Sequence, residues 1–267
     1  MEFLTKVSIP APGFLIEPME EMLFTGSCFA DAIGHRFVEE QFRAVVNPFG
    51  VMYNPASILH TVERTDATPR TAVFTLGTNH VYILNETGKI VDNCQKRPQR
   101  LFTEKELSID ECFDYLERAF LSLQKRRDDV RLVITVSPIR YAKYGYHGSR
   151  LSKAVLLLAA DRLVKKFPDV CYYFPAYEIM NDELRDYRFY KPDMLHPSNQ
   201  AVEYIWQQFH DNLLSDAARQ FIAEYQPIKK AFAHRPFNPE AEEYKLFIQK
   251  AEEDFKALKE KYAEFLK

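Results

Sequence analysis

The stretch Met-Leu-Phe-Thr-Gly-Ser-Cys-Phe-Ala, residues 22–30, joins a short, mostly apolar run to a turn and to the start of a helix. Residues 22–25 predict a buried strand. A helix is predicted from Cys28 to Phe42, because Phe29, Ile33, Phe37 and Val38 recur at near-helical spacing. Gly26-Ser27 then forms the connection between strand and helix, so this stretch begins a βα unit.

The alternation of strands and helices continues along most of the chain. Strands are predicted at residues 44–46, 71–76, 130–136 and 170–174, and helices at about 54–63, 108–127, 149–167 and 197–214. Residues 81–84 and 90–91 flank a turn at 86–89 and predict a hairpin. Because βαβ units give a mostly parallel sheet with helices on both faces, we expect an α/β fold.

Size, charge and cysteine spacing exclude several classes of protein. The 267 residues suffice for one α/β domain with an appendage, and the formal net charge of −3 offers no basic excess for a nucleic-acid partner. No apolar run is long enough to span a bilayer, and the N-terminus lacks a secretory signal pattern, so we expect a cytoplasmic protein with no membrane partner. The cysteines have no C-x-x-C spacing, which predicts reduced thiols, no metal site and no cofactor; they are Cys28, Cys94, Cys112 and Cys171.

The last part of the chain differs in character. We predict a domain over residues 1–214 and a helical extension over 215–267. In the extension, apolar residues recur at alternating spacings of four and three on a highly charged helix; they are Tyr244, Ile248, Ala251, Phe255, Leu258, Tyr262 and Phe265. Such a stripe fits a helix packed on its own chain, and it also fits a coiled-coil contact in a homodimer.

Two short motifs carry chemistry. Ser27 follows a strand and precedes a helix, where its side chain lies at the sheet edge and backbone N–H groups can face developing negative charge. Asp193-x-x-His196 lies late in the chain, and its spacing lets the carboxylate turn back to one imidazole nitrogen while the other serves the serine. The sequence therefore predicts Ser27 as nucleophile, His196 as base and Asp193 as its orienting partner.

The backbone and side-chain amides near the same edge suggest an oxyanion hole. Gly50 and Asn79 each follow a predicted strand, so they share the edge of the sheet with Ser27. The predicted donors to a carbonyl oxygen are the N–H groups of Ser27 and Gly50 and the side-chain amide of Asn79.

These blocks resemble those of the SGNH/GDSL hydrolase superfamily: an early serine, a glycine after the second strand, Gly77-x-Asn79 after the third and Asp193-x-x-His196 near the end. More narrowly, residues 26–30 read Gly-Ser-Cys-Phe-Ala, the motif that names the GSCFA family. The resemblance covers about residues 20–214. It implies a three-layer α/β/α, flavodoxin-like fold and a hydrolase site. The third block of the superfamily usually reads Gly-x-Asn-Asp, whereas this chain has His80 after Asn79. Because of this departure, Asn93 is kept as the alternative to Asn79 for the third oxyanion donor.

The favoured interpretation is a serine esterase that cleaves a small O-acyl ester on a carbohydrate or another polar carrier. An acyltransferase with the same residues, a binding or scaffold protein that keeps the fold, and an enzyme using the Cys28 thiol are the alternatives. Arg140, Tyr144, Arg185 and Arg188 are candidates to bind a polar substrate, with solvated or salt-bridged arginines as the alternative. His80 and His147 are candidates to line the pocket, with surface loop histidines as the alternative. Residue types alone do not select the acyl group or its carrier.

Overall fold

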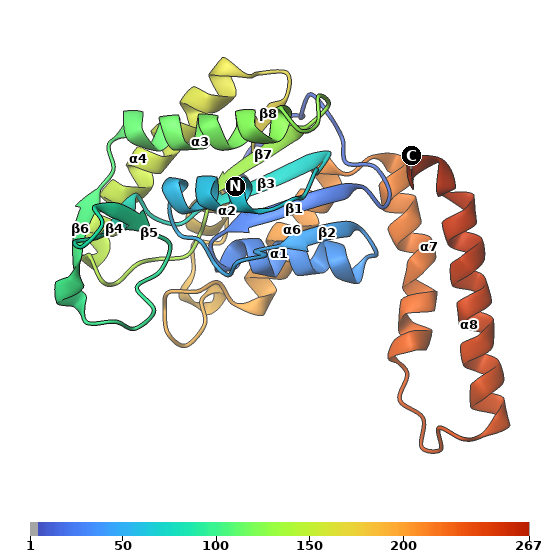
Figure 1. The fold of residues 1–267 in the computed structure, drawn as a ribbon. Helices are drawn as coiled ribbons and strands as arrows, with labels where there is room; N and C mark the ends of the chain where they lie inside the picture. Colours follow the sequence, from blue (N-terminus) through green and yellow to red (C-terminus); the bar gives the residue numbers. More distant parts are fainter. Residues whose placement is uncertain (1–4, 267) are drawn as a thin grey trace.

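A five-stranded parallel sheet forms the centre of the computed structural model, which describes residues 5–266 (Figure 1). Its strands are β1 (Glu21–Gly26), β2 (Arg43–Val46), β3 (Thr71–Leu76), β7 (Arg131–Val136) and β8 (Cys171–Tyr173). They are ordered β2-β1-β3-β7-β8, and every neighbouring pair is parallel. This is the flavodoxin-like order, and it confirms the predicted α/β sheet.

Helices cover both faces of this sheet and create two apolar cores. α1 (Cys28–Glu39) and α6 (Asn199–Leu213) lie on one face, whereas α2 (Pro55–Arg64), α3 (Ile109–Gln124) and α4 (Gly145–Lys166) lie on the other (Figure 1). Successive strand residues alternate between the cores, so that Leu23 packs with α2–α4 and Phe24 packs with α1 and α6. None of the helices within residues 5–266 has the length and apolar character needed to cross a membrane.

Most predicted elements are present, with shifted ends. α1 ends at Glu39 rather than Phe42, because Gln41 adopts a φ of 66° and Phe42 turns into the core. α6 begins at Asn199 rather than residue 197, since Ser198 caps it by accepting a hydrogen bond from the Ala201 N–H. Short helical turns at Ala176–Glu178, Ile179–Glu183 and Tyr187–Phe189 separate β8 from the Asp193-x-x-His196 loop.

A smaller antiparallel sheet lies beside the main one, in the order β5-β4-β6. β4 (His80–Leu84) and β5 (Lys89–Val91) confirm the predicted hairpin. β6 (Phe102–Glu106), preceded by a 3₁₀ turn at Gln99–Leu101, was not predicted. Its sequence Phe-Thr-Glu-Lys-Glu buries only Phe102, so the strand gives almost no apolar signal and depends on its pairing with β4.

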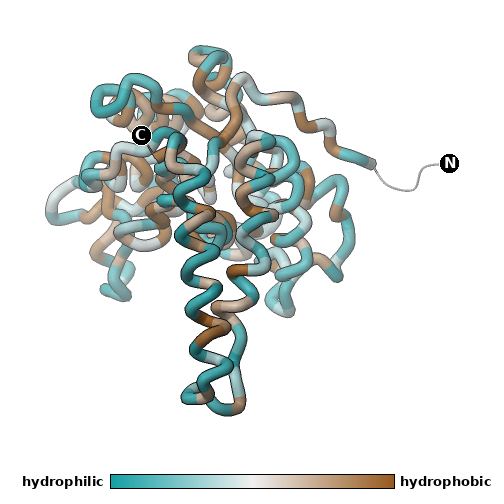
Figure 2. Tube along the Cα trace, turned by 90° about the vertical axis from the view of Figure 1, so that its right-hand side faces the viewer, coloured by the Kyte–Doolittle hydropathy of each residue, from teal (hydrophilic) through white to brown (hydrophobic). Residues whose placement is uncertain are grey.

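The C-terminal extension forms a helical hairpin that projects from the body (Figure 1). It consists of α7 (Asp216–Ala233), α8 (Glu242–Lys261) and a 3₁₀ turn at Ala263–Leu266. The apolar stripe of α8 packs on α7, with ring centroids 5.4 Å apart for Tyr225–Phe255 and 5.2 Å for Phe221–Tyr262. Figure 2 shows hydrophilic residues along much of the projecting hairpin. The stripe thus has an intramolecular partner, while homodimerisation and the domain boundary at residue 214 stay predictions.

Candidate active site

The β1–α1 turn lies directly against β3 because Gly26 has no side chain. Gly26 adopts a φ of +140°, and a Cβ atom there would lie 2.2 Å from the backbone oxygen of Thr75. Its N–H donates to Asn47 Oδ1 at 2.9 Å, and the next N–H, of Ser27, donates to the Thr75 oxygen at 3.0 Å. The turn is therefore fixed on both sides, which gives the residues that follow it a defined position at the sheet edge.

The Ser27 side chain is turned into the protein. The residue is fully buried, its hydroxyl lies 3.0 Å from Thr75 Oγ1, and it accepts the Phe29 N–H at 3.2 Å as the N-cap of α1. No hydrogen bond joins Ser27 to His196 in the described part of the chain. The structure thus gives Ser27 a capping role, while its role as the nucleophile stays a prediction.

Cys28, by contrast, is partly exposed as the first residue of α1. Its thiol neighbours the half-exposed side chain of Tyr53: burial raises the pKa of Tyr53, and the charge of Cys28 and a hydrogen bond with it raise it further. The Cys28 N–H has no acceptor among residues 5–266. A thiol and an unpaired N–H at a helix N-terminus suit a nucleophile and an oxyanion donor, because the helix dipole stabilises negative charge there.

Asp193 and His196 form a joined pair on their loop. Asp193 Oδ2 lies 2.7 Å from His196 Nδ1, and Oδ1 accepts the N–H groups of His196 at 3.0 Å and Leu195 at 2.8 Å. These bonds, led by the one from the His196 backbone, lower the pKa of Asp193 to about 2. The aspartate is therefore ionised at neutral pH and orients the imidazole, whose Nε2 has no protein partner among residues 5–266.

This loop is fastened to the segment that follows β7. The Arg140 N–H donates to the Leu195 oxygen at 3.0 Å, and Arg140 Nη1 donates to the Met194 oxygen, also at 3.0 Å. β7 pairs with β3, and β3 pairs with β1, in parallel register to their carboxyl ends. The histidine loop and the Gly26–Cys28 turn consequently belong to one rim of the sheet, as the order of elements predicts.

The predicted oxyanion donors are not assembled in this conformation. The Ser27 N–H is held by Thr75, the Gly50 N–H donates to the Asn47 oxygen at 2.8 Å, and Asn79 is buried with its amide donating to the Leu107 oxygen at 2.8 Å. Asn93 is exposed and lines, with Gly50, a separate groove of about 420 Å³. In this conformation the backbone N–H groups of Ser27 and Gly50 and one N–H of the Asn79 amide are used within the protein, so the predicted oxyanion hole stays a prediction.

Sequence reasoning missed Lys153. This α4 side chain is 2% exposed, and its Nζ donates to the backbone oxygens of Gly77 at 2.7 Å and Ser137 at 2.8 Å. The ammonium group thereby joins the ends of β3 and β7 directly below the rim. The available signal was its position: Lys153 falls on the helix face shared by the buried residues Ser149, Leu156 and Ala160.

The burial of Lys153 predicts a pH-dependent stability. Burial lowers the pKa of Lys153 to about 7, so between this value and the ordinary lysine pKa the unfolded chain binds more protons than the folded one. The free energy of unfolding should therefore rise between about pH 7 and about pH 10 relative to that of Lys153→Met, as measured by urea unfolding. Lys165→Met, on the exposed face of α4, should keep the wild-type profile; identical profiles for wild type and Lys153→Met would contradict the assignment.

The other residues predicted to line the pocket lie at several different places in the fold. His80 is buried and stacks on Tyr144 with ring centroids 3.6 Å apart, and burial lowers the pKa of His80. Arg188 faces Asp186 at 4.0 Å, and His147 is exposed on α4. Arg140 and Arg185 do line one cavity together. Within the part of the chain that the structure describes, no cluster of three or more histidine, cysteine or carboxylate side chains could hold a metal ion.

Comparison with known proteins defines the relationships of the chain. A model described as the GSCFA family matches residues 21–70 and 67–209, and one described as the GSCFA domain protein, C-terminal domain, matches residues 225–266. No curated protein matches. Among solved structures, a mutant of the acetyl-xylooligosaccharide esterase Axe2 from Geobacillus stearothermophilus is 13% identical with a TM-score of 0.51, over 77% of this chain and 99% of that one.

A second solved structure supports the same fold assignment. It is described as a putative GDSL-like lipase from Parabacteroides merdae, is 9% identical and has a TM-score of 0.50, over 76% of this chain and 99% of that one. Identities this low establish the shared architecture alone. The three-layer fold of the GDSL-like hydrolases is thus confirmed.

Proposed function

From the premise that this chain belongs to the GSCFA family, we propose that it is an acyl-ester hydrolase that cleaves a small O-acyl group from a carbohydrate or another polar carrier. The observation that carries the proposal is the Asp193–His196 pair, joined at 2.7 Å on a loop that belongs to the same rim as an accessible thiol. An acetylxylan esterase among the structures of the same fold agrees with this chemistry.

The geometry favours Cys28 over Ser27 as the nucleophile. The Ser27 hydroxyl is buried and engaged with Thr75 and the Phe29 N–H, whereas the Cys28 thiol is partly exposed at the helix N-terminus. Ser27 is buried and Cys28 is partly exposed, so Cys28 is the one of these two neighbours that a substrate at the rim can reach. Ser27, the choice from the sequence pattern, then caps α1 and holds Cys28 in place.

The proposed reaction has two acyl-transfer steps. His196 Nε2 takes the Cys28 proton, the thiolate attacks the ester carbon, and the Cys28 N–H donates to the developing oxyanion. Collapse of the tetrahedral intermediate breaks the C–O bond, and the leaving alcohol takes the proton from His196. Water then attacks the thioester as His196 removes its proton, which releases the carboxylic acid and restores the thiol. A hydroxyl acceptor in place of water would make the same site an acyltransferase.

Substitution of the two neighbouring residues tests this choice of nucleophile. Cys28→Ala should lower kcat/KM for p-nitrophenyl acetate by about 10⁴-fold, as expected for loss of a covalent nucleophile. Ser27→Ala should lower thermal stability, through loss of the N-cap, far more than it lowers the rate. Iodoacetamide at pH 7 should label Cys28 faster than Cys94, the other partly exposed thiol, as located by mass spectrometry.

The opposite pattern of results would restore the serine. Full activity in Cys28→Ala, together with loss of activity and of fluorophosphonate labelling in Ser27→Ala, would make Ser27 the nucleophile. Absence of turnover and of active-site labelling in the wild-type protein would instead support a binding or scaffold role for the fold. Inactive variants purified in the same way serve as the control, because any ester hydrolysis in those preparations comes from contaminating esterases.

A further inference from the structure

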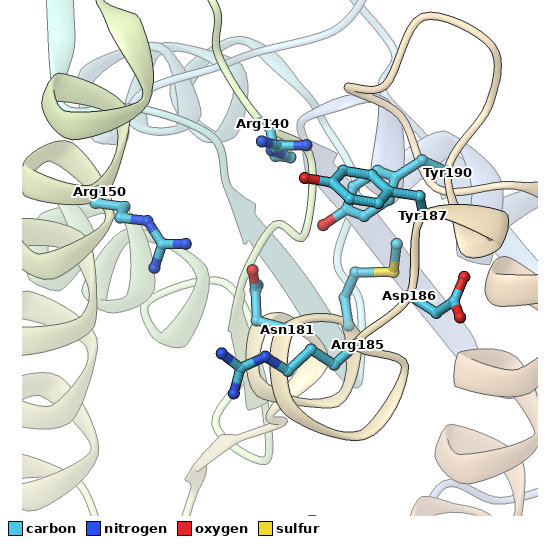
Figure 3. Close-up of a pocket in the computed structure, with 8 residues that line it drawn as sticks. Arg140, Arg150, Asn181, Arg185, Asp186, Tyr187 and Tyr190 are labelled. Atoms are coloured by element: carbon cyan, nitrogen blue, oxygen red, sulfur yellow. The ribbon is translucent and has the colours of Figure 1, made fainter.

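Three arginine side chains converge on one cavity of about 290 Å³ beside the candidate active site (Figure 3). Arg140 follows β7, Arg150 lies on α4, and Arg185 follows the turn Ile179–Glu183. The three residues come from separate segments, so the tertiary fold alone brings them together. Asn181 and Tyr190 complete the polar part of the lining.

No carboxylate of the described residues lies within ion-pair distance of these three arginines, although Arg185 also borders a second groove lined by Glu178, Asp182 and Glu183. Among residues 5–266, none of the three forms an ion pair. Asp186 also lines the cavity, but its carboxylate accepts the Arg188 N–H at 2.8 Å and faces the Arg188 guanidinium at 4.0 Å. A chain with a net charge of −3 thus concentrates positive charge in one small concave site, which is a favourable environment for an anion.

Arg140 is held in position rather than free in solvent. Its guanidinium lies over the Tyr146 ring at 4.2 Å and the Tyr190 ring at 5.2 Å, and Nη1 donates to the Met194 oxygen at 3.0 Å. Burial raises the pKa of Tyr190, although Arg140 and Arg150 act against it, so the phenol remains a hydrogen-bond donor. Preorganised donors lose little conformational entropy when a ligand binds.

The same contacts connect the cavity to the histidine loop. Tyr190 pairs with Pro197 across the base of that loop, and Arg140 binds the backbone of Met194 and Leu195 within it. We infer that the arginine cavity binds an anionic group, a carboxylate or a phosphate, carried by the substrate whose ester is cleaved at His196. The inference rests on the proposed hydrolase function for its substrate, while anion binding itself can be measured without turnover.

The binding experiment uses inorganic phosphate and succinate as probes. Isothermal titration at low ionic strength should show binding of at least one of them to the wild-type protein, weakened about tenfold or more in Arg150→Gln/Arg185→Gln. Arg162→Gln is the matched control, because Arg162 lies on the same helix as Arg150 but pairs with Asp110 away from the cavity. Wild-type protein that binds neither anion, or equal affinities in all three proteins, would overturn the inference.

The kinetic experiment compares three aryl acetates that differ in charge: 4-acetoxybenzamide, 4-acetoxybenzoate and 4-acetoxyphenyl phosphate. The wild-type enzyme should have a higher kcat/KM for an anionic ester than for the neutral one, and the ratio should fall about tenfold or more in Arg150→Gln/Arg185→Gln. The preferred charged ester identifies the carboxylate or the phosphate. A ratio unchanged by the double substitution would refute the substrate assignment.

Failure of this inference can be told apart from failure of the hydrolase proposal. Rapid hydrolysis of the neutral ester with no anion preference and no anion binding would refute the arginine site alone. Anion binding that depends on Arg150 and Arg185, in a protein that hydrolyses none of the three esters, would support the anion site and refute the hydrolase proposal. Titration of the His196→Ala protein provides the binding measurement with ester turnover removed.

Discussion

His196→Ala should lower kcat/KM for p-nitrophenyl acetate by about 10⁴-fold, comparable with loss of the nucleophile, because members of such a unit act together. His196 is the proposed base for either nucleophile, and Asp193 holds it through Nδ1 at 2.7 Å. Without the imidazole, the thiol keeps its proton and the leaving alcohol receives none. Initial rates at several substrate concentrations would separate kcat from KM.

Two further substitutions give this experiment its controls. Asp193→Asn keeps the shape of the loop but removes the ionised partner, so we expect a large loss of rate with little change in KM. His147→Ala removes an exposed histidine outside the site and should behave as wild type. Retention of more than about a tenth of the wild-type activity in His196→Ala would exclude His196 as the general base, since such bases contribute about 10²-fold or more.

Gly26→Ala should destabilise the protein by about 4 kcal/mol or more, the range reached when a substitution combines backbone strain with a clash in the core. The added Cβ atom would lie 2.2 Å from the Thr75 oxygen and 2.8 Å from the Thr75 nitrogen. Both are backbone atoms of the central strand β3 and cannot rotate away as a flexible side chain could. The φ of +140° is itself unfavourable for any residue with a side chain.

Gly88→Ala is the matched control for this substitution. Gly88 also has a positive φ, +64°, but no atom lies within 4 Å of the position that its Cβ would occupy. We expect it to cost only about 1 kcal/mol, which reports the backbone strain alone. Chemical unfolding of both variants gives the difference due to the clash with β3. Equal losses of stability in the two variants would contradict the close approach of the β1–α1 turn to Thr75.

Local patterns in the sequence predicted most of the fold. The apolar strands, the capping residues Asn54 and Ser108 and the turn at 86–89 act over a few neighbouring residues, so their signals are visible in the chain itself. β6 escaped prediction because its formation depends on pairing with β4 rather than on its own residues. The Asp193–His196 contact could be predicted from the sequence for the same reason as the turns, because its two residues are only three positions apart.

The remaining parts of the candidate site depend on long-range contacts. Whether Ser27 or Cys28 faces the rim follows from the direction of the first turn of α1 and from the position of Thr75, 48 residues later. Gly50 and Asn79 were predicted as oxyanion donors by residue type, and only the structure shows that the Gly50 N–H binds Asn47 and that one Asn79 amide N–H binds Leu107. The type of a residue does not by itself determine which of its possible hydrogen-bond partners it will have in the folded chain.

The sequence by itself determined the alternation of strands and helices and the pairing of Asp193 with His196, because these arise from interactions between near neighbours in the chain. The shared rim followed from that alternation through the general rule that the carboxyl ends of parallel strands meet at one edge. Only the tertiary structure decided that the Ser27 hydroxyl turns inward while Cys28 stays accessible, that Lys153 joins the ends of β3 and β7, and that three arginines from separate segments share one cavity. Burial, hydrogen-bond competition and charge convergence are properties of packed surfaces, and those surfaces exist only once the β2-β1-β3-β7-β8 sheet has brought distant segments side by side.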